Sequence, residues 1–270
     1  MRLRILARPL ILGMMLLMAI PADAEPVRLY AAGSLKAALT DVVAAYEKAT
    51  GQAVEPVFGP SGVLRERIEQ GEPAHLFASA DMGHPRKLHD DGKGGPVRLF
   101  ARNKLCALAR PGLEVTESNL LATISRSDVR VGISTPKLDP SGDYAWQLFE
   151  KAEAVQPGSQ SLLQGKALQL TGAPGSEKPP ADRNAYAWHV DAGKADVFLT
   201  YCTNAVLARR EVPNLQVVQV PPDLAVAADY GLVVLAGAPK AAQALADFIV
   251  AGDGQAILAG HGFETADGSR

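Results

Sequence analysis

Short apolar runs alternate along the chain with segments whose apolar residues recur every three to four positions. The short runs predict strands and the periodic segments predict amphipathic helices. Strands are expected at Val27–Ala31, Ala53–Phe58, Leu76–Ala80, Val97–Ala101, Leu105–Ala109, Arg130–Ile133, Val197–Tyr201, Leu215–Val220 and Tyr230–Leu235. Helices are expected at Leu35–Thr50, Gly62–Gln70, His84–Asp91, Asn119–Arg126, Gly142–Ala154, Ser159–Leu170, Arg183–Ala192, Lys240–Ala251 and Gly254–Ala259. This alternation is typical of an α/β protein whose mostly parallel sheets are flanked by helices.

Two extended segments contain few turn-forming residues, so they are candidates for the stretches where the chain passes from one lobe to the other. They are Val97–Ala109 and Leu224–Leu235. Two crossings predict a discontinuous first lobe, residues 25–102 and 225–270, and a continuous second lobe, residues 103–224. A cleft between two such lobes, closing by a hinge motion, is the expected ligand site.

The first 24 residues have the pattern of an export signal. Three arginines (Arg2, Arg4 and Arg8) precede the apolar stretch Leu10–Ile20, and Ala22-Asp23-Ala24 follows as a small-x-small cleavage pattern. We expect cleavage after Ala24 and export to a bacterial periplasm. The apolar stretch is short for a membrane span, which needs about 20 residues, although retention as a signal anchor stays open.

Charge and cysteine content narrow the classes of partner. Removing residues 1–24 takes away three arginines and one aspartate, which changes the net charge from −2 to about −4. An acidic chain argues against nucleic acid as a partner, because phosphate backbones are bound by basic faces. The two cysteines, Cys106 and Cys202, both lie in strand-like segments. An even count in an oxidising compartment permits one disulfide between them, if the two strands are neighbours.

Two serines follow consecutive predicted strands and precede predicted helices. Ser34 stands in Ala31-Ala32-Gly33-Ser34-Leu35, and Ser61 stands in Phe58-Gly59-Pro60-Ser61-Gly62. Strand-to-helix turns face the ligand crevice of an open α/β sheet, and helix N-termini attract anions. A serine at such a place either caps its helix or donates a neutral hydroxyl to an anion. The pair predicts half of an oxyanion site, with simple capping as the alternative.

The signatures of catalysis and of metal binding are missing. Ser61 is not in a G-x-S-x-G nucleophile elbow, because Val63 stands where the second glycine is required. His84 and His89 are five residues apart, which does not place two imidazoles on one helix face as H-E-x-x-H does. We therefore expect no catalytic residues, no metal site and no cofactor.

Taken together, several motifs resemble the molybdate-binding periplasmic proteins of bacterial molybdenum ABC transporters. Ala31–Leu35 and Phe58–Leu64 look like that family's two oxyanion loops. Asp139–Ala145 is similar to its turn opening a helix of the second lobe, and Val197–Tyr201 to its strand ending in a ligand-binding tyrosine. Gly260–Phe263 resembles its terminal glycine-phenylalanine motif. The resemblance implies a two-lobed type II periplasmic binding protein, with the ligand between the lobes.

The resemblance also implies a set of ligand contacts. These are the hydroxyl and amide of Ser34 and of Ser61, the Tyr201 hydroxyl, and backbone amides at Ser141 and near Arg183. The implied ligand is molybdate, with tungstate as a second one, and any metal would be bound only as the oxyanion. The implied partner is a membrane permease, and we expect a monomer. Arg183 departs from the family: pointing inward it would add a charge to the site, whereas pointing outward it would leave only its amide.

Three other functions stay open on the sequence. The chain could bind another oxyanion, such as sulfate or phosphate, or a small organic acid. It could be an exported hydrolase that uses Ser34 or Ser61 as nucleophile, although no histidine is placed to activate either one. It could also be a ligand-sensing module that signals through a protein partner, because its binding lobes would look the same.

Overall fold

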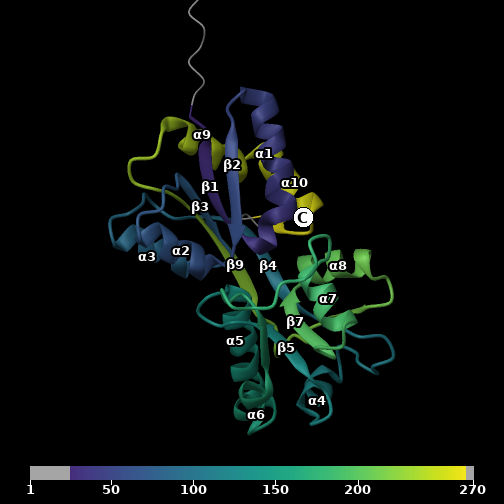
Figure 1. Ribbon diagram of the computed structural model, residues 1–270. Helices are drawn as coiled ribbons and strands as arrows, with labels where there is room; N and C mark the ends of the chain where they lie inside the picture. Colours follow the sequence, from purple (N-terminus) through teal and green to yellow (C-terminus); the bar gives the residue numbers. More distant parts are fainter. Residues whose placement is uncertain (1–24, 266–270) are drawn as a thin grey trace, which may run out of the picture.

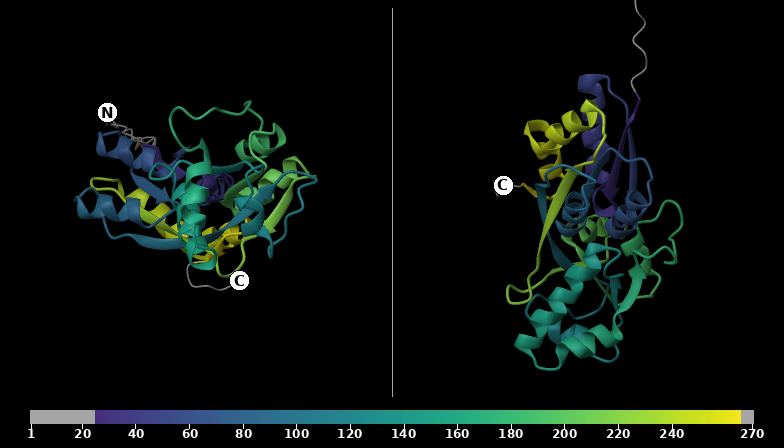
Figure 2. Two further views of the ribbon diagram at one scale, coloured as in Figure 1. Left: turned by 90° about the horizontal axis from the view of Figure 1, so that it is seen from below. Right: turned by 90° about the vertical axis from the view of Figure 1, so that its left-hand side faces the viewer.

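The computed structural model describes residues 25–265 and shows an elongated molecule made of two halves (Figures 1 and 2). The strands are β1 (Val27–Ala32), β2 (Val54–Gly59), β3 (Leu76–Ser79), β4 (Arg98–Ala109), β5 (Val131–Ser134), β6 (Leu168–Thr171), β7 (Val197–Tyr201), β8 (Gln216–Gln219), β9 (Ala227–Val234) and β10 (Glu264–Thr265). The helices are α1 (Lys36–Thr50), α2 (Ser61–Glu69), α3 (Gly83–Asp90), α4 (Leu120–Ser125), α5 (Pro140–Val155), α6 (Ser159–Lys166), α7 (Ala185–Asp191), α8 (Cys202–Glu211), α9 (Lys240–Val250) and α10 (Gly252–Gly260). A 3-10 turn, Gly33–Leu35, precedes α1.

The strands follow the order β2-β1-β3-β9-β4-β7-β5-β6, with β8 and β10 also paired to β4. In the first lobe, which we define as β1–β3, β9 and β10 with α1–α3, α9 and α10, strands β2, β1 and β3 are parallel and β9 is antiparallel. In the second lobe, β5–β8 with α4–α8, strands β7, β5 and β6 are parallel. This arrangement is the α/β fold of type II periplasmic binding proteins, as the sequence predicted.

One long strand joins the two lobes (Figure 1). The first half of β4 pairs with β9, from Arg98 opposite Leu232 to Lys104 opposite Ala227. Its second half pairs with β7 and β8, from Leu105 opposite Tyr201 to Ala109 opposite Val197. The predicted crossings therefore coincide with β4 and with the segment that leads into β9. The boundaries after residues 102 and 224 remain predictions.

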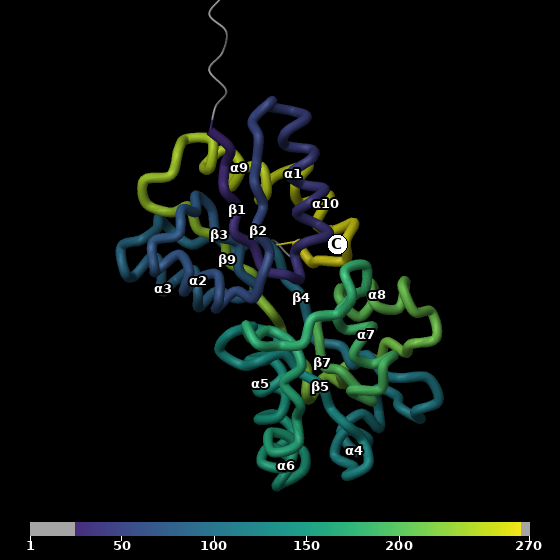
Figure 3. Tube along the Cα trace, viewed as in Figure 1, coloured from purple at the N-terminus to yellow at the C-terminus, as the bar shows by residue number. Residues whose placement is uncertain are grey.

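Alternation along the central strands explains why helices cover both faces of the first-lobe sheet. Leu29 and Leu76 belong to the cluster packed beneath α1 and α9, whereas Tyr30 and Phe77 belong to the cluster on the face of α2 and α3. Successive side chains of a strand point to opposite faces, so a run of apolar residues needs cover on both. The turns that lead from β1 and β2 into the following helices lie at the edge of the sheet that faces the second lobe (Figure 3).

The structure differs from the predicted elements in four places, of which the simplest is the short strand β10, which was not predicted. The two predicted strands of the first crossing are one strand, β4. The predicted helix Ser159–Leu170 ends at Lys166, and the residues after it form the short strand β6. Helix α8 was not predicted, because it follows β7 without an intervening loop and its first residue, Cys202, was read as the end of the strand. The predicted signal peptide lies outside the described residues.

A disulfide joins Cys106 of β4 to Cys202 at the start of α8, with the Cα atoms 4.8 Å apart. The two strands that lead to it are hydrogen-bonded neighbours, with Cys106 opposite Thr200. The bond therefore fixes the junction of β7 and α8, directly after Tyr201. Within residues 25–265, no helix is both long enough and apolar enough to cross a membrane.

Candidate functional site

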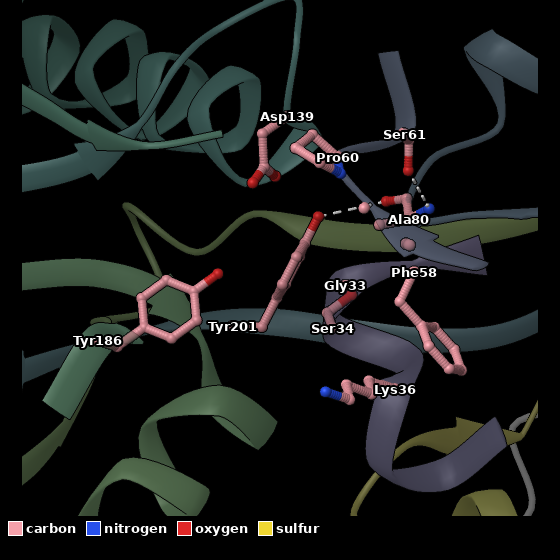
Figure 4. A pocket seen from close by; sticks show the side chains of 12 residues that line it. Gly33, Ser34, Lys36, Phe58, Pro60, Ser61, Ala80, Asp139, Tyr186 and Tyr201 are labelled. Atoms are coloured by element: carbon pink, nitrogen blue, oxygen red, sulfur yellow. Dashed lines mark hydrogen bonds between the residues drawn. The ribbon is translucent and has the colours of Figure 1, made fainter. Parts of the chain in front are cut away.

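A cavity of about 250 Å³ lies where the turns of the first lobe face the second lobe (Figure 4). The first lobe contributes the turns after β1, β2 and β3, and the second lobe contributes the start of α5, the first turn of α7 and the end of β7. The lining residues are Ala32, Gly33, Ser34, Lys36, Phe58, Gly59, Pro60, Ser61, Ala80, Asp139, Tyr186 and Tyr201. The cavity thus has the position that the sequence predicted for the ligand cleft.

Ser61 is the first residue of α2 and its side chain is fully buried. Its Oγ accepts a hydrogen bond from the amide of Ala80 at 3.1 Å. Because that bond uses a lone pair, the hydroxyl proton of Ser61 remains for donation. Of the first-turn amides of α2, that of Gly62 donates to the Leu138 carbonyl, whereas the Ser61 amide at the start of the helix has no acceptor inside its own helix. Ser61 therefore brings a hydroxyl and a helix N-terminus to the cavity.

Ser34 lies on the 3-10 turn that precedes α1. Its Oγ is 3.1 Å from the hydroxyl of Tyr230, a fully buried side chain of β9. Burial raises the pKa of Tyr230 well above its usual value, so this phenol stays neutral. Two neutral hydroxyls can exchange the roles of donor and acceptor, which leaves Ser34 able to donate to a ligand.

Tyr201 is the last residue of β7, and its hydroxyl donates to the carbonyl oxygen of Ala80 at 3.3 Å. Burial raises the pKa of Tyr201 well above its usual value, so the hydroxyl keeps its proton. The amide of Ala80 binds Ser61 of the first lobe while its carbonyl binds Tyr201 of the second (Figure 4). A second contact between the lobes is the bond from the Gly62 amide to the Leu138 carbonyl, 2.9 Å long. The two lobes are therefore joined by hydrogen bonds at Ala80 and at Gly62.

Asp139 places a carboxyl group in the same cavity. It caps α5, and its Oδ1 accepts a hydrogen bond from the Ser141 amide at 3.0 Å. Desolvation raises the pKa of Asp139 to about 6, against the opposing effects of the Ser141 amide and the Ser134 hydroxyl. In the sequence, Asp139 stands in an Asp-Pro-Ser-Gly motif, where aspartate before proline is typical of a helix start; no pattern there indicates that its side chain faces the ligand cavity.

Lys36 and Tyr186 are two further lining residues that the sequence analysis did not single out. Lys36 opens α1, is exposed, and brings a positive charge to the cavity. Tyr186 lies in the first turn of α7, and burial raises the pKa of its phenol well above the usual value. In Figure 4 both side chains point into the space in front of Tyr201. Together with Asp139 they make this site more polar than three neutral hydroxyls alone.

Two of the five predicted contact residues do not line the cavity. Ser141 is fully buried, and its amide is used by Asp139. Its hydroxyl has no hydrogen-bond partner within residues 25–265. Ser141 directly follows the proline that opens α5. Its amide therefore faces the carboxylate of Asp139, which caps the helix. In this structure the Ser141 amide is occupied by the Asp139 carboxylate, and its predicted contact with the ligand stays a prediction.

Arg183 points away from the cavity. Its Nε is 2.5 Å from Glu211 Oε1 and its guanidinium also pairs with Asp191 at 3.0 Å. Its amide donates to the Pro180 carbonyl, and α7 begins two residues later, at Ala185. The sequence left two orientations of the Arg183 side chain open, and the structure shows the outward one. The Arg183 amide is occupied by the Pro180 carbonyl as well. Arg183 instead lines an adjoining hollow of about 760 Å³ that shares Ser34, Lys36 and Tyr186 with the cavity.

Comparison with known proteins places this geometry in a family. The family described as bacterial extracellular solute-binding protein matches residues 27–264. An uncharacterised protein of Pasteurella multocida is 36% identical over 206 residues, which cover 76% of this chain and 85% of the relative. The molybdate-binding protein ModA of Azotobacter vinelandii is 29% identical over 155 residues, covering 56% of this chain and 61% of ModA.

Solved structures share the fold at low sequence identity. The periplasmic molybdate-binding protein of Azotobacter vinelandii superimposes with a TM-score of 0.71 at 22% identity, covering 88% of this chain and 98% of that one. The sulfate-binding protein SubI of Mycobacterium tuberculosis gives 0.73 at 19% identity, covering 90% and 87%. PEB3 with bound L-phospholactate gives 0.66 at 17% identity, covering 88% and 98%. The family match over nearly the whole described chain shows that this protein belongs to the bacterial extracellular solute-binding proteins, a family of binding proteins and not of enzymes.

Proposed function

We propose that this protein captures a tetrahedral oxyanion of the molybdate and tungstate type in the cavity between its lobes and delivers it to an ABC permease. The observation that carries the proposal is the convergence of three neutral hydroxyls, those of Ser34, Ser61 and Tyr201, on one cavity. A buried oxyanion must replace its lost hydration by hydrogen bonds. Donors fixed on helix ends and strand ends supply those bonds with a set geometry.

The relatives support this proposal without naming the ligand of this chain. A molybdate-binding protein is among the sequence relatives, and molybdate- and sulfate-binding proteins share the fold. Binding followed by hinge closure needs no covalent step, which agrees with a site that lacks a nucleophile–base pair. Closure would keep Gly62 and Leu138 in contact and hold the solute between the lobes.

A second candidate is a small organic acid that carries a phosphate or carboxylate group. Lys36 and Asp139 favour it, because a cation and a carboxylate in one cavity suit a ligand with both an anionic and a hydrogen-bond-donating part. The adjoining hollow beside Arg183 offers space for the remainder of such a molecule. The fold is shared with PEB3, whose structure contains L-phospholactate.

A thermal-shift and calorimetry panel separates the two. The mature protein is titrated with molybdate, tungstate, sulfate, phosphate and L-phospholactate at pH 6. A ligand present at about 100 times its Kd adds about 2.7 kcal/mol of stability. Large shifts with molybdate and tungstate alone support the first proposal. A shift with L-phospholactate and none with the metal oxyanions supports the second, and no shift with any of the five overturns both.

A further inference from the structure

Asp139 is the one lining residue of the cavity whose side chain can only accept hydrogen bonds when ionised. The hydroxyls of Ser34, Ser61, Tyr186 and Tyr201 can all donate, and Lys36 donates only. An ionised carboxylate set against a fully deprotonated dianion is repulsive, because neither partner has a proton to share. The same carboxylate is favourable toward a ligand oxygen that carries a proton.

The surroundings of Asp139 offer little to neutralise it. Asp143, on its own helix, is a like charge and raises its pKa. Tyr186 from α7 and Tyr201 from β7 face it as neutral phenols, and Ser134 from β5 provides a hydroxyl. Lys36, across the cavity on α1, is the one cation among the lining residues. With Oδ1 occupied by the Ser141 amide, the carboxylate keeps Oδ2 as its second acceptor.

We propose that the site takes up its oxyanion together with one proton, held in a hydrogen bond between the carboxyl group of Asp139 and a ligand oxygen. This inference rests on the proposed function and adds a rule for how the site distinguishes protonated from fully deprotonated anions. Hydrogen phosphate brings the proton itself. A fully deprotonated dianion such as molybdate binds only when Asp139 takes up a proton from solvent. No covalent bond forms or breaks except the O–H bond of that proton.

Because the pKa of Asp139 is raised to about 6, the need to take up a proton should change dianion binding at pH values near neutrality. Below it the free protein already holds the proton, so dianion affinity is independent of pH. Above it each pH unit weakens dianion binding tenfold, because a proton must be recruited. Hydrogen phosphate keeps its own proton up to strongly alkaline pH, so its affinity does not fall in this way.

The test is calorimetry of molybdate and of phosphate at pH 5.5, 7 and 8.5, each in two buffers of different ionisation enthalpy. The difference between buffers counts the protons taken up per ligand bound. We expect about one proton per molybdate at pH 8.5, only a small fraction of a proton at pH 5.5, and a Kd that rises at the higher pH. Binding of molybdate at pH 8.5 without proton uptake overturns the inference and leaves the proposed function standing.

Asp139→Asn provides the second arm, because an amide can still cap α5 and can donate to a deprotonated oxygen. This variant is expected to bind molybdate independently of pH, about 100-fold more tightly than the wild type at pH 8. Asp182→Asn is the matched control: it removes one exposed carboxylate beside the neighbouring hollow and should keep the wild-type proton count. Proton uptake that persists in Asp139→Asn assigns the proton elsewhere and refutes the role of Asp139. Failure of both anions to bind the wild type at every pH refutes the proposed function, and this inference with it.

Discussion

At the scale of single residues, the cavity separates side chains that can reach a ligand from those that only support them. Ser61 and Tyr201 line it and bind the backbone amide and the backbone carbonyl of Ala80, respectively. Ser141 is fully buried and is not among the lining residues. The sequence motif treated all three alike, and only their place in the fold distinguishes them.

Removing one lining hydroxyl should weaken ligand binding without unfolding the protein. We expect Ser61→Ala and Tyr201→Phe each to cost about 1.5–3 kcal/mol of binding free energy, because a hydrogen bond to a charged ligand is lost. Isothermal titration with the ligand identified by the panel measures this cost. Ser141→Ala is the matched control and should bind like the wild type, since its hydroxyl makes no bond within the described chain. Equal losses in Ser141→Ala would place that residue in the site after all.

The raised pKa of Asp139 also predicts the pH dependence of stability. The folded chain holds this proton up to about pH 6, whereas an unfolded aspartate loses it near pH 3.8. The carboxyl group therefore costs stability that grows as pH rises from about 4 to 6 and stays constant above. Asp139→Asn should stabilise the ligand-free protein at pH 8 by on the order of 2 kcal/mol, and much less at pH 4.5. Urea unfolding at the two pH values checks this; an equal effect at both would contradict it.

At the scale of elements, the turns that were predicted best are those where a strand leads into a helix after a glycine. The β1 and β2 turns could be predicted because apolar runs, glycine and serine coincide there. Helix α8 could not, because it starts directly at the end of β7 with no breaker between them. The residues of α7 that face the cavity could not be predicted either. The helix begins after its Asn184 cap, whereas the sequence pattern predicted a start at Arg183. Which helix end touches the ligand is decided by packing between lobes, which no local pattern records.

The start of α2 also forms the contact between the lobes, and Gly62 is essential to it. A Cβ at Gly62 would lie 2.5 Å from the Lys137 carbonyl oxygen and 2.9 Å from the Leu138 Cα, in the facing lobe. Gly62→Ala should therefore hold the lobes apart and lower ligand affinity at least tenfold while the protein stays folded. Gly165→Ala is the control, because a Cβ there meets nothing within 4 Å, and it should leave affinity unchanged. Small-angle scattering of both variants with ligand would show a larger radius of gyration for Gly62→Ala alone. Wild-type affinity in Gly62→Ala would show that the ligand does not need this contact.

At the scale of the whole molecule, the sequence predicted the α/β fold class with its two lobes, whereas the boundaries of the two crossings stay predictions. It could do so because apolar periodicity is a property of each segment. The ion pairs that turn Arg183 outward, and the approach of Asp139 to Ser34 across the cleft, arise only when distant segments meet. The proposed anion specificity depends on those long-range placements, which is why the motif alone did not reveal the carboxyl group.

The disulfide is the covalent tie within the second lobe, and it spans 96 residues of sequence. Closing a loop of this size is expected to stabilise the folded chain by about 2–4 kcal/mol. The double variant Cys106→Ala, Cys202→Ala should show a lower Tm and weaker ligand binding, because the bond anchors the residue after Tyr201. Calorimetric melts with and without ligand measure both effects. An unchanged Tm would mean that strand pairing alone fixes this junction.

The backbone of Ala80, whose amide is bonded to Ser61 of one lobe and whose carbonyl is bonded to Tyr201 of the other, has a consequence for transport. The Tyr201 hydroxyl donates a hydrogen bond to a carbonyl of the opposite lobe, so this phenol is itself a link between the lobes. A solute that accepts a hydrogen bond from the same hydroxyl competes with the 3.3 Å bond to the carbonyl. Loading would therefore change a contact between the lobes, and a permease that senses how the lobes meet could tell a loaded carrier from an unloaded one at this tyrosine.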